Sequence, residues 1–196
     1  MPDTCARSAL ARFAGGDSLA CWSGDAIGIR ELPFAAIVRV QALDDACGAA
    51  AGAAIGVALP GPGTLVQDDG RSVAWVAPCE WLVFLEPSAE PALLAALAAA
   101  GAGVFATPIG DARTGIAVEG ARAAEVLARG TGLDLHPSVF PEGRVTNTRL
   151  AQLAVMLARA PGMPGFHVWV DRSAGAWLWQ WLLDAASEFA PAAHDH

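Results

Sequence analysis

The sequence predicts a single α+β domain in which helices pack on mixed, largely antiparallel sheets. Strand-like and helix-like segments are interspersed along the whole chain rather than gathered in separate halves. The chain also has 196 residues, a length that suits one domain and can bury a sizeable core without disulfides. We expect residues 1–24 to form a flexible arm, residues 25–190 to form the domain, and residues 191–196 to form a loose tail.

From residue 25 to residue 100, strands and helices are expected in turn. Residues 35–40 (AAIVRV) are apolar and β-branched, which is typical of a strand. An aspartate pair after them can cap a small-residue helix that ends near Ile55. The turn-rich segment 60–70 (PGPGTLVQDDG) is expected to be a loop. Residues 72–85 resemble two short strands divided by a proline, and residues 87–100 form a helix with leucines along one stripe.

The second half continues in the same way. In chain order we expect strands over 103–109 and 115–118, a helix over 121–129, strands within 144–158 and over 166–170, and a helix over 174–189. A polar turn that contains Asp111 separates the first two of these strands. Two prolines make the segment 133–143 irregular.

The composition excludes several classes of function. The chain has 12 Lys+Arg and 20 Asp+Glu, for a formal net charge of −8, and every basic residue is an arginine. Without lysine there is no phosphate-binding P-loop lysine and no Schiff base. The acidic balance argues against nucleic acid or an anionic membrane as a partner. With neither a secretory signal nor a segment able to span a bilayer, we expect a cytoplasmic protein.

The familiar catalytic and metal-binding patterns fail on context. The cysteines are far apart and form no C-x-x-C pair, so they do not predict a zinc site. Residues 101–106 (GAGVFA) fit the glycine pattern of dinucleotide sites, but here a helix precedes the glycines and a strand follows them. His136 and His167 are each compatible with a general base or with a structural role. We therefore predict no catalytic residues, no cofactor and no metal for this chain.

One acidic residue has unusual neighbours. Glu80 lies among Trp75, Trp81 and Phe84, where a carboxylate can be partly desolvated and its pKa raised. Exposure on a strand edge is the alternative for Glu80. An ion pair or a turn cap is the simpler role for Asp111.

The predicted last helix carries three tryptophans: Trp177, Trp179 and Trp181. Together with the leucines between them, they occupy three faces of the helix and leave little polar surface. A helix that is apolar around most of its girth must be buried on more than one side. A partner subunit is the natural cover for one side, and tryptophan is enriched at interface hot spots. We predict an interface at these tryptophans, with burial in the domain core or ligand stacking as the alternatives.

Several segments together resemble the gamma subunit family of heterotetrameric sarcosine oxidases. They are residues 73–85 (VAWVAPCEWLVFL), 110–120 (GDARTGIAVEG), 132–143 (GLDLHPSVFPEG), 145–159 (VTNTRLAQLAVMLAR) and 166–183 (FHVWVDRSAGAWLWQWLL). The resemblance runs from about residue 28 to residue 189. One subunit of N-methylglutamate dehydrogenase looks similar and is an alternative.

The resemblance implies the folate-binding fold of the glycine-cleavage T-protein, with two intertwined β-α-β units. It implies a complex that oxidises sarcosine to glycine, hydrogen peroxide and a one-carbon unit captured by tetrahydrofolate. This chain would be a non-catalytic subunit that contributes to assembly with alpha, beta and delta subunits. FAD, FMN, NAD, zinc and tetrahydrofolate would be bound by those other subunits.

This chain departs from the family pattern at one position. Cys79 stands where the family tends to have an acidic residue before the glutamate. A relic of the T-protein folate carboxylate would therefore fall on Glu80, with Trp81 and Asp111 as the other candidates for a vestigial folate pocket. A stand-alone folate-binding protein that resembles an aminomethyltransferase is a further alternative.

Overall fold

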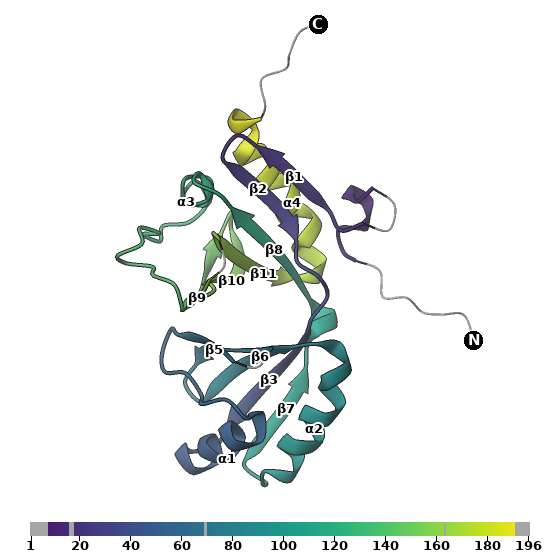
Figure 1. Ribbon diagram of the computed structural model, residues 1–196, viewed down its shortest axis with the longest axis vertical. Helices are drawn as coiled ribbons and strands as arrows, with labels where there is room; N and C mark the ends of the chain where they lie inside the picture. Colours follow the sequence, from purple (N-terminus) through teal and green to yellow (C-terminus); the bar gives the residue numbers. More distant parts are fainter. Residues whose placement is uncertain (1–7, 16–17, 69, 163, 191–196) are drawn as a thin grey trace, which may run out of the picture.

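The computed structural model describes residues 8–15, 18–68, 70–162 and 164–190; the predicted tail, residues 191–196, lies outside them. The described chain contains two β-sheets, one above the other in Figure 1. The upper sheet has six strands in the order β1-β2-β8-β11-β10-β9, and the lower has five in the order β4-β5-β6-β3-β7. Every pairing between neighbouring strands is antiparallel. The prediction of an α+β fold with largely antiparallel sheets is confirmed.

The lower sheet comes from one continuous stretch of chain. Its strands are β3 (Ala36–Ala42), β4 (Leu65–Asp68), β5 (Arg71–Ala77), β6 (Glu80–Leu85) and β7 (Val104–Pro108). Helices α1 (Asp45–Ile55) and α2 (Glu90–Ala99) cover one of its faces, and the short η2 (Pro87–Ala89) leads into α2.

Helix α1 begins and ends as its sequence predicts. The side chain of Asp44 accepts a hydrogen bond from the backbone N–H of Cys47 at 2.8 Å, which satisfies a donor that has no partner within the helix. That bond lowers the pKa of Asp44. Gly56 ends the helix with φ of 79°, a left-handed conformation that glycine adopts without a steric penalty.

The upper sheet comes from two separate stretches of chain. Its strands are β1 (Cys21–Gly24), β2 (Ile27–Glu31), β8 (Arg113–Glu119), β9 (Arg144–Leu150), β10 (Leu153–Arg159) and β11 (Phe166–Asp171). Since β2 pairs with β8, the chain leaves this sheet after β2, builds the whole lower sheet, and returns through η3 (Gly110–Ala112). This connection intertwines the two halves of the molecule, as predicted.

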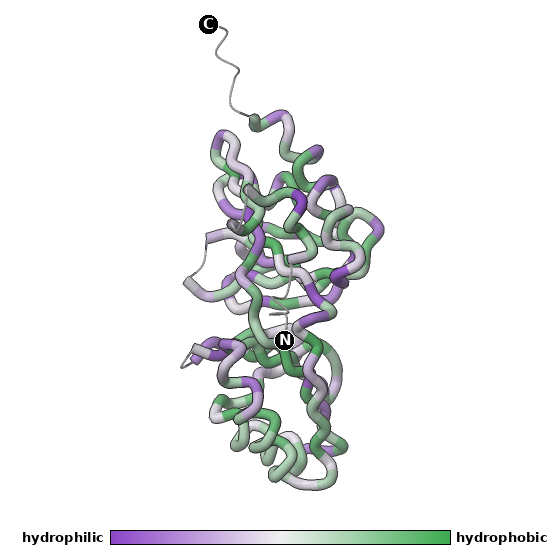
Figure 2. The backbone as a smooth tube through the Cα atoms, turned by 90° about the vertical axis from the view of Figure 1, so that its right-hand side faces the viewer, coloured by the Kyte–Doolittle hydropathy of each residue, from purple (hydrophilic) through white to green (hydrophobic). Residues whose placement is uncertain are grey.

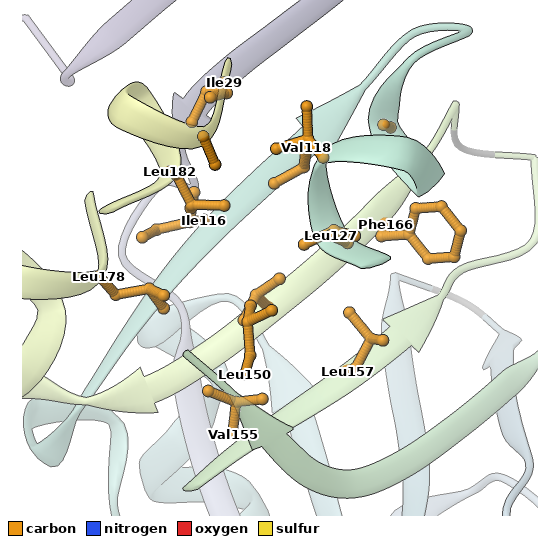
Figure 3. Close-up of a cluster of buried hydrophobic side chains, with 14 of the residues drawn as sticks. Ile29, Ile116, Val118, Leu127, Leu150, Val155, Leu157, Phe166, Leu178 and Leu182 are labelled. Atoms are coloured by element: carbon orange, nitrogen blue, oxygen red, sulfur yellow. The ribbon is translucent and has the colours of Figure 1, made fainter. Parts of the chain in front are cut away.

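Helices α3 (Ala123–Ala128) and α4 (Arg172–Ala186) pack on one face of the upper sheet, and η4 (Ser187–Phe189) follows α4. Figure 3 shows the resulting core, in which leucines of α4 meet isoleucines and valines of the strands. Ile116, Leu127, Leu178 and Leu182 are fully buried there. In the residues that the structure describes, no helix combines the length and apolar character needed to cross a membrane.

A third apolar cluster joins the two sheets. Ile37 and Phe84 of the lower sheet pack with Met156 and Ala158 of the upper sheet. Backbone hydrogen bonds close one corner, because Leu65 N–H donates to Gly143 O at 2.7 Å. Hydrophobic segments accordingly occur in both the upper and the lower parts of the tube in Figure 2.

The N-terminal region differs from the prediction of a flexible arm over residues 1–24. Its described part contains η1 (Ala11–Phe13) and strand β1, which pairs with β2. Leu10 and Ala20 are fully buried in the core of the upper sheet. Apolar residues in this segment therefore complete the core, which a count of its mixed composition does not reveal.

Strands β2 and β4 were also not predicted. Strand β2 buries Ile27, Ile29 and Glu31 and turns the residues between them outward. That alternation has the period of two expected for a half-buried strand. Strand β4 lies inside the segment predicted to be a loop, where Leu65 is its one buried residue. Turn residues on both sides of β4 conceal a strand that is only four residues long.

Candidate functional site

A cavity of about 360 Å³ lies where the two sheets face each other. The lower sheet contributes Arg39, Glu80 and Phe84 to its wall, and the upper sheet contributes Arg113 and Trp169. Side chains alternate along a strand, so these residues point between the sheets while their neighbours point into the helix-covered cores. This inter-sheet cleft is the candidate functional site.

One carboxylate of the cleft is held by two neighbours on β3. Glu80, the first residue of β6, pairs with Gln41 in the β3–β6 register. Arg39 Nε lies 2.8 Å from Glu80 Oε1, and Arg39 Nη2 donates to Oε2 at 3.0 Å. Gln41 Nε2 also donates to Oε2 at 3.0 Å. Both oxygens of Glu80 therefore already accept hydrogen bonds from the lower sheet itself.

A second ion pair lies on the upper sheet. Arg113 and Asp171 face each other in the β8–β11 register, and Arg113 Nη1 lies 3.2 Å from Asp171 Oδ1. Both residues line the cleft. Each carboxylate of the cleft thus has an arginine beside it, so the charges inside the cleft are balanced.

Aromatic rings form the apolar part of the wall. Phe84 and Trp169 meet across the two sheets, with ring centroids 4.8 Å apart and an angle of 42° between planes. His167 lies edge-on to Trp169 with centroids 5.5 Å apart. Contacts of this kind add to the apolar burial that holds the sheets together. The cleft therefore resembles a partly filled joint between the sheets.

His167 is the one buried histidine of the described chain. Its side chain is 9% exposed, and its Nε2 has no hydrogen-bond partner in the described part of the molecule. Burial lowers the pKa of His167, the positive charge of Arg30 lowers it further, and Glu119 opposes both effects. Glu119 itself is ion-paired with Arg30 at 2.7 Å. His167 is therefore neutral near pH 7 and packs as a core residue.

The three candidates for a vestigial folate pocket do not line one cavity. Glu80 faces the inter-sheet cleft. Trp81 follows it on the same strand and points to the opposite face, where its Nε1 donates to Pro60 O at 3.0 Å. Asp111 lies in η3 beside a different, shallow depression. These residues do not fit a folate site, and no folate chemistry is derived from them.

An open groove of about 620 Å³ runs along α1 on the other side of the lower sheet. Its floor consists of small residues of α1, including Gly48 and Gly52, and Trp81 and Cys79 lie at its side. Cys79 occupies the turn between β5 and β6 with φ of 57°, which is uncommon for a residue with a side chain. Since Asp44 and Asp45 are its ionisable carboxylates, the groove has no arrangement suited to catalysis.

The three tryptophans of α4 have three different environments. Trp179 is 2% exposed and contacts Phe13 in the upper core, with ring centroids 6.2 Å apart. Trp181 is partly buried against the same core beside Gly130, where an added Cβ would lie 2.6 Å from its ring. Trp177 is 49% exposed. The prediction of an interface is wrong for Trp179, because the core of the chain already covers it; only Trp177 presents a largely free face.

Two residues of the cleft escaped the sequence analysis. Arg39 interrupts the otherwise apolar run of the first predicted strand, and this break was the available signal. Trp169 alternates with buried valines along β11, so its opposite orientation could be deduced from the period of two. In the described residues, no group of three His, Cys, Asp or Glu side chains could hold a metal ion.

The family model described as "Sarcosine oxidase, gamma subunit family" matches residues 39–188, most of both sheets. The chain belongs to the sarcosine oxidase gamma subunit family. Among curated members, the subunit gamma of Corynebacterium sp. (strain U-96) is 34% identical over 193 residues, covering 95% of this chain and 92% of its own. The subunit gamma of Arthrobacter sp. is 32% identical over 170 residues, covering 84% and 82%.

Solved structures agree with this gamma-family membership. A chain of the heterotetrameric sarcosine oxidase from Corynebacterium sp. U-96, in complex with pyrrole 2-carboxylate, matches with a TM-score of 0.81 and 30% identity. The match covers 97% of this chain and 98% of that one. The glycine cleavage aminomethyltransferase T from Bartonella henselae matches with a TM-score of 0.61 and 17% identity, over 82% of this chain and 46% of that one. This second likeness shows the fold alone, and confirms the predicted T-protein-like fold.

Proposed function

We propose that this chain is the non-catalytic gamma subunit of a heterotetrameric sarcosine oxidase and contributes to its assembly with alpha, beta and delta subunits. The observation that carries the proposal is the match to a chain of such a complex over nearly the full length of both chains. The complex oxidises sarcosine to glycine, hydrogen peroxide and a one-carbon unit captured by tetrahydrofolate. FAD, FMN, NAD, zinc and tetrahydrofolate are bound by the other subunits.

The chemistry of the inter-sheet cleft supports a non-catalytic role. Glu80 and Asp171 each have an arginine beside them, so neither carboxylate has the raised pKa that a general acid needs. His167 is buried beside the Arg30–Glu119 pair, away from bulk water. The three free cysteines of the described chain suit a reducing compartment, which supports a cytoplasmic location.

Co-expression tests the proposal directly. The chain, tagged at Met1, is produced with the candidate alpha, beta and delta subunits and purified through the tag. We expect a yellow complex that forms hydrogen peroxide when sarcosine is added. Recovery of this chain alone, colourless and well behaved, would contradict the proposal. Turnover of N-methylglutamate instead of sarcosine would favour the dehydrogenase alternative, and calorimetric binding of tetrahydrofolate to the isolated chain would favour a stand-alone folate-binding protein.

Trp177 supplies the surface variant for the same experiment. Trp177→Glu places a charge on the exposed face of α4, and we expect it to reduce the amount of co-purified partner subunits. Val139→Glu is the matched control, because Val139 is 54% exposed on the loop that precedes β9. Equal recovery with both variants would show that α4 does not face a partner.

A further inference from the structure

Strand β7 forms one edge of the lower sheet. It pairs with β3 on one side, and no strand within the described residues pairs with its other side. Figure 1 shows β7 at the border of the lower sheet, beside α2. An open strand edge presents unpaired backbone N–H and C=O groups to whatever lies next to it.

The register identifies which backbone groups point outward. Ile109 N–H donates to Ile37 O at 2.7 Å at one end of the β3–β7 ladder, and Leu43 N–H donates to Gly103 O at 3.0 Å at the other. Hydrogen-bonded and non-bonded pairs alternate along an antiparallel ladder. Phe105 and Thr107 therefore direct their backbone groups toward β3.

Between these two residues, Ala106 directs its N–H and C=O away from the sheet. The carbonyls of Val104 and Pro108 point the same way. Val104 N–H already donates to Gly101 O at 3.2 Å, and proline has no N–H. The free edge is thus centred on Ala106, with one acceptor on either side of it.

The side chains of β7 leave this edge unprotected. The strand (VFATP) contains no charged residue, and Phe105 is 50% exposed. Leu43, which bonds to Gly103 just before β7, is 71% exposed. Proteins usually protect an open edge with charged side chains, bulges or very short strands. The proline at the end of β7 is its one such feature.

The other three edges are better protected. Strand β9 exposes Arg144 and lies against the β4 side of the lower sheet, where Val145 N–H donates to Gly63 O at 3.0 Å. Strand β4 ends in the charged Asp68. Strand β1 has four residues, and just after it Asp25 N–H donates to Phe189 O at 2.6 Å. Among the described strands, β7 combines an open edge with an exposed aromatic side chain.

We propose that the open edge of β7 binds an extended segment of a partner subunit, which adds to the lower sheet as a further strand. The inference rests on the proposed function, because it names the partner's secondary structure within the same complex. The partner segment exchanges hydrogen bonds with Ala106, donates to the carbonyls of Val104 and Pro108, and packs an apolar side chain against Phe105.

A second copy of this chain fits the edge less well. If two β7 strands paired around Ala106, Val104 of each copy would lie opposite Pro108 of the other. Proline cannot donate to the Val104 carbonyl, and the Val104 N–H is already committed to Gly101. A self-paired edge keeps the bonds at Ala106 but loses those on both sides, whereas a partner segment without proline makes them all.

Hydrogen exchange in the intact complex tests the proposal at one amide. Thr107 N–H is bonded within the sheet, so it exchanges slowly with or without a partner. We expect Ala106 N–H in the complex to exchange within about tenfold of Thr107 N–H, because a partner carbonyl accepts it. Residue-resolved mass spectrometry of the peptide that contains β7 measures both rates. An Ala106 amide that exchanges at the rate of an unprotected loop residue in the complex overturns the proposal.

Two variants test the same edge through assembly. Ala106→Pro removes the outward N–H and leaves the β3 bonds in place, since proline is tolerated on a strand edge whose N–H faces away from the sheet. Phe105→Arg keeps the backbone and adds a protecting charge. Phe34→Arg is the matched control, a phenylalanine with the same 50% exposure that lies outside the strands. We expect both β7 variants to reduce co-purified partner subunits at least ~tenfold relative to the control.

The outcomes separate this inference from the proposed function. If the wild-type chain assembles and Phe105→Arg assembles equally well, the β7 inference is wrong and the subunit assignment stands. Equal losses with Phe105→Arg and Phe34→Arg also overturn it, because the effect is then not specific to the edge. If the wild-type chain forms only a homodimer that protects Ala106, both proposals are wrong. Phe105→Arg decides the matter should Ala106→Pro fail to fold.

Discussion

Replacing Trp179 by alanine is expected to destabilise the isolated fold strongly, whereas replacing Trp177, on the same helix, is not. Trp179 is 2% exposed and packs against Phe13 and the core of the upper sheet. Truncation of a buried tryptophan costs about 3–5 kcal/mol, because transfer free energy is lost and a cavity remains. For a domain of about 200 residues, each kcal/mol corresponds to roughly 2–4 °C in Tm. We therefore expect Tm to fall by about 6–20 °C.

Thermal and urea unfolding of the purified chain, followed by circular dichroism, measure this difference. Trp177→Ala is the matched control, and we expect it to change the stability by no more than about 0.5 kcal/mol because half of its side chain is already in water. If Trp179→Ala proves as mild as Trp177→Ala while it abolishes assembly, then Trp179 acts at an interface and the packing assignment is wrong.

Three further predictions test the core, a tight turn and the cleft. Protonation of His167 is disfavoured in the folded state, because its pKa lies below the ordinary value of 6.5. The unfolded chain thus takes up a proton as pH falls through 6.5 while the folded chain does not, and the stability decreases; His167→Phe should reduce this decrease between pH 8 and pH 5.5 in urea titrations. Gly165→Ala should destabilise by about 1–3 kcal/mol, because φ is 84° and the new Cβ would lie 2.2 Å from Val118 O. Gly162→Ala, in the same loop with φ of 67° and open space around it, should cost less, and similar melting temperatures would refute the contact argument. Glu80→Gln should leave sarcosine turnover by the assembled complex within about twofold of wild type if the subunit is non-catalytic, whereas a hundredfold loss in kcat with intact assembly would assign chemistry to the cleft.

The elements with strong local signals could be predicted from the sequence. The apolar and β-branched run of β3, the capping aspartate of α1 and the leucine stripe of α2 are each specified within a few residues. Strands β1 and β4 lack such signals. They have four residues each, and their stability comes from pairing with β2 and β5 rather than from their own composition. Local sequence therefore identifies the centre of each sheet better than its edges.

The tryptophans of α4 show a different limit. A helix that is apolar on several faces must be covered on several sides, and this inference was correct. The covers are the upper sheet and the N-terminal segment that carries Leu10 and Phe13, which was predicted to be an arm. Because this segment was left out of the fold, its share of the covering was assigned to a partner subunit. The error at Trp179 thus follows from the error at residues 1–24.

The folate-pocket candidates failed for a reason that the sequence already contained. Glu80 and Trp81 are consecutive residues of a strand, and consecutive side chains point to opposite faces of a sheet. One strand cannot direct both into the same pocket unless a bulge intervenes, and the irregularity of this hairpin lies between Trp75 and Ala77, before β6 begins. Glu80 therefore belongs with Arg39, on the alternate residues of the neighbouring strand, and this pairing turns a possible ligand carboxylate into part of the sheet.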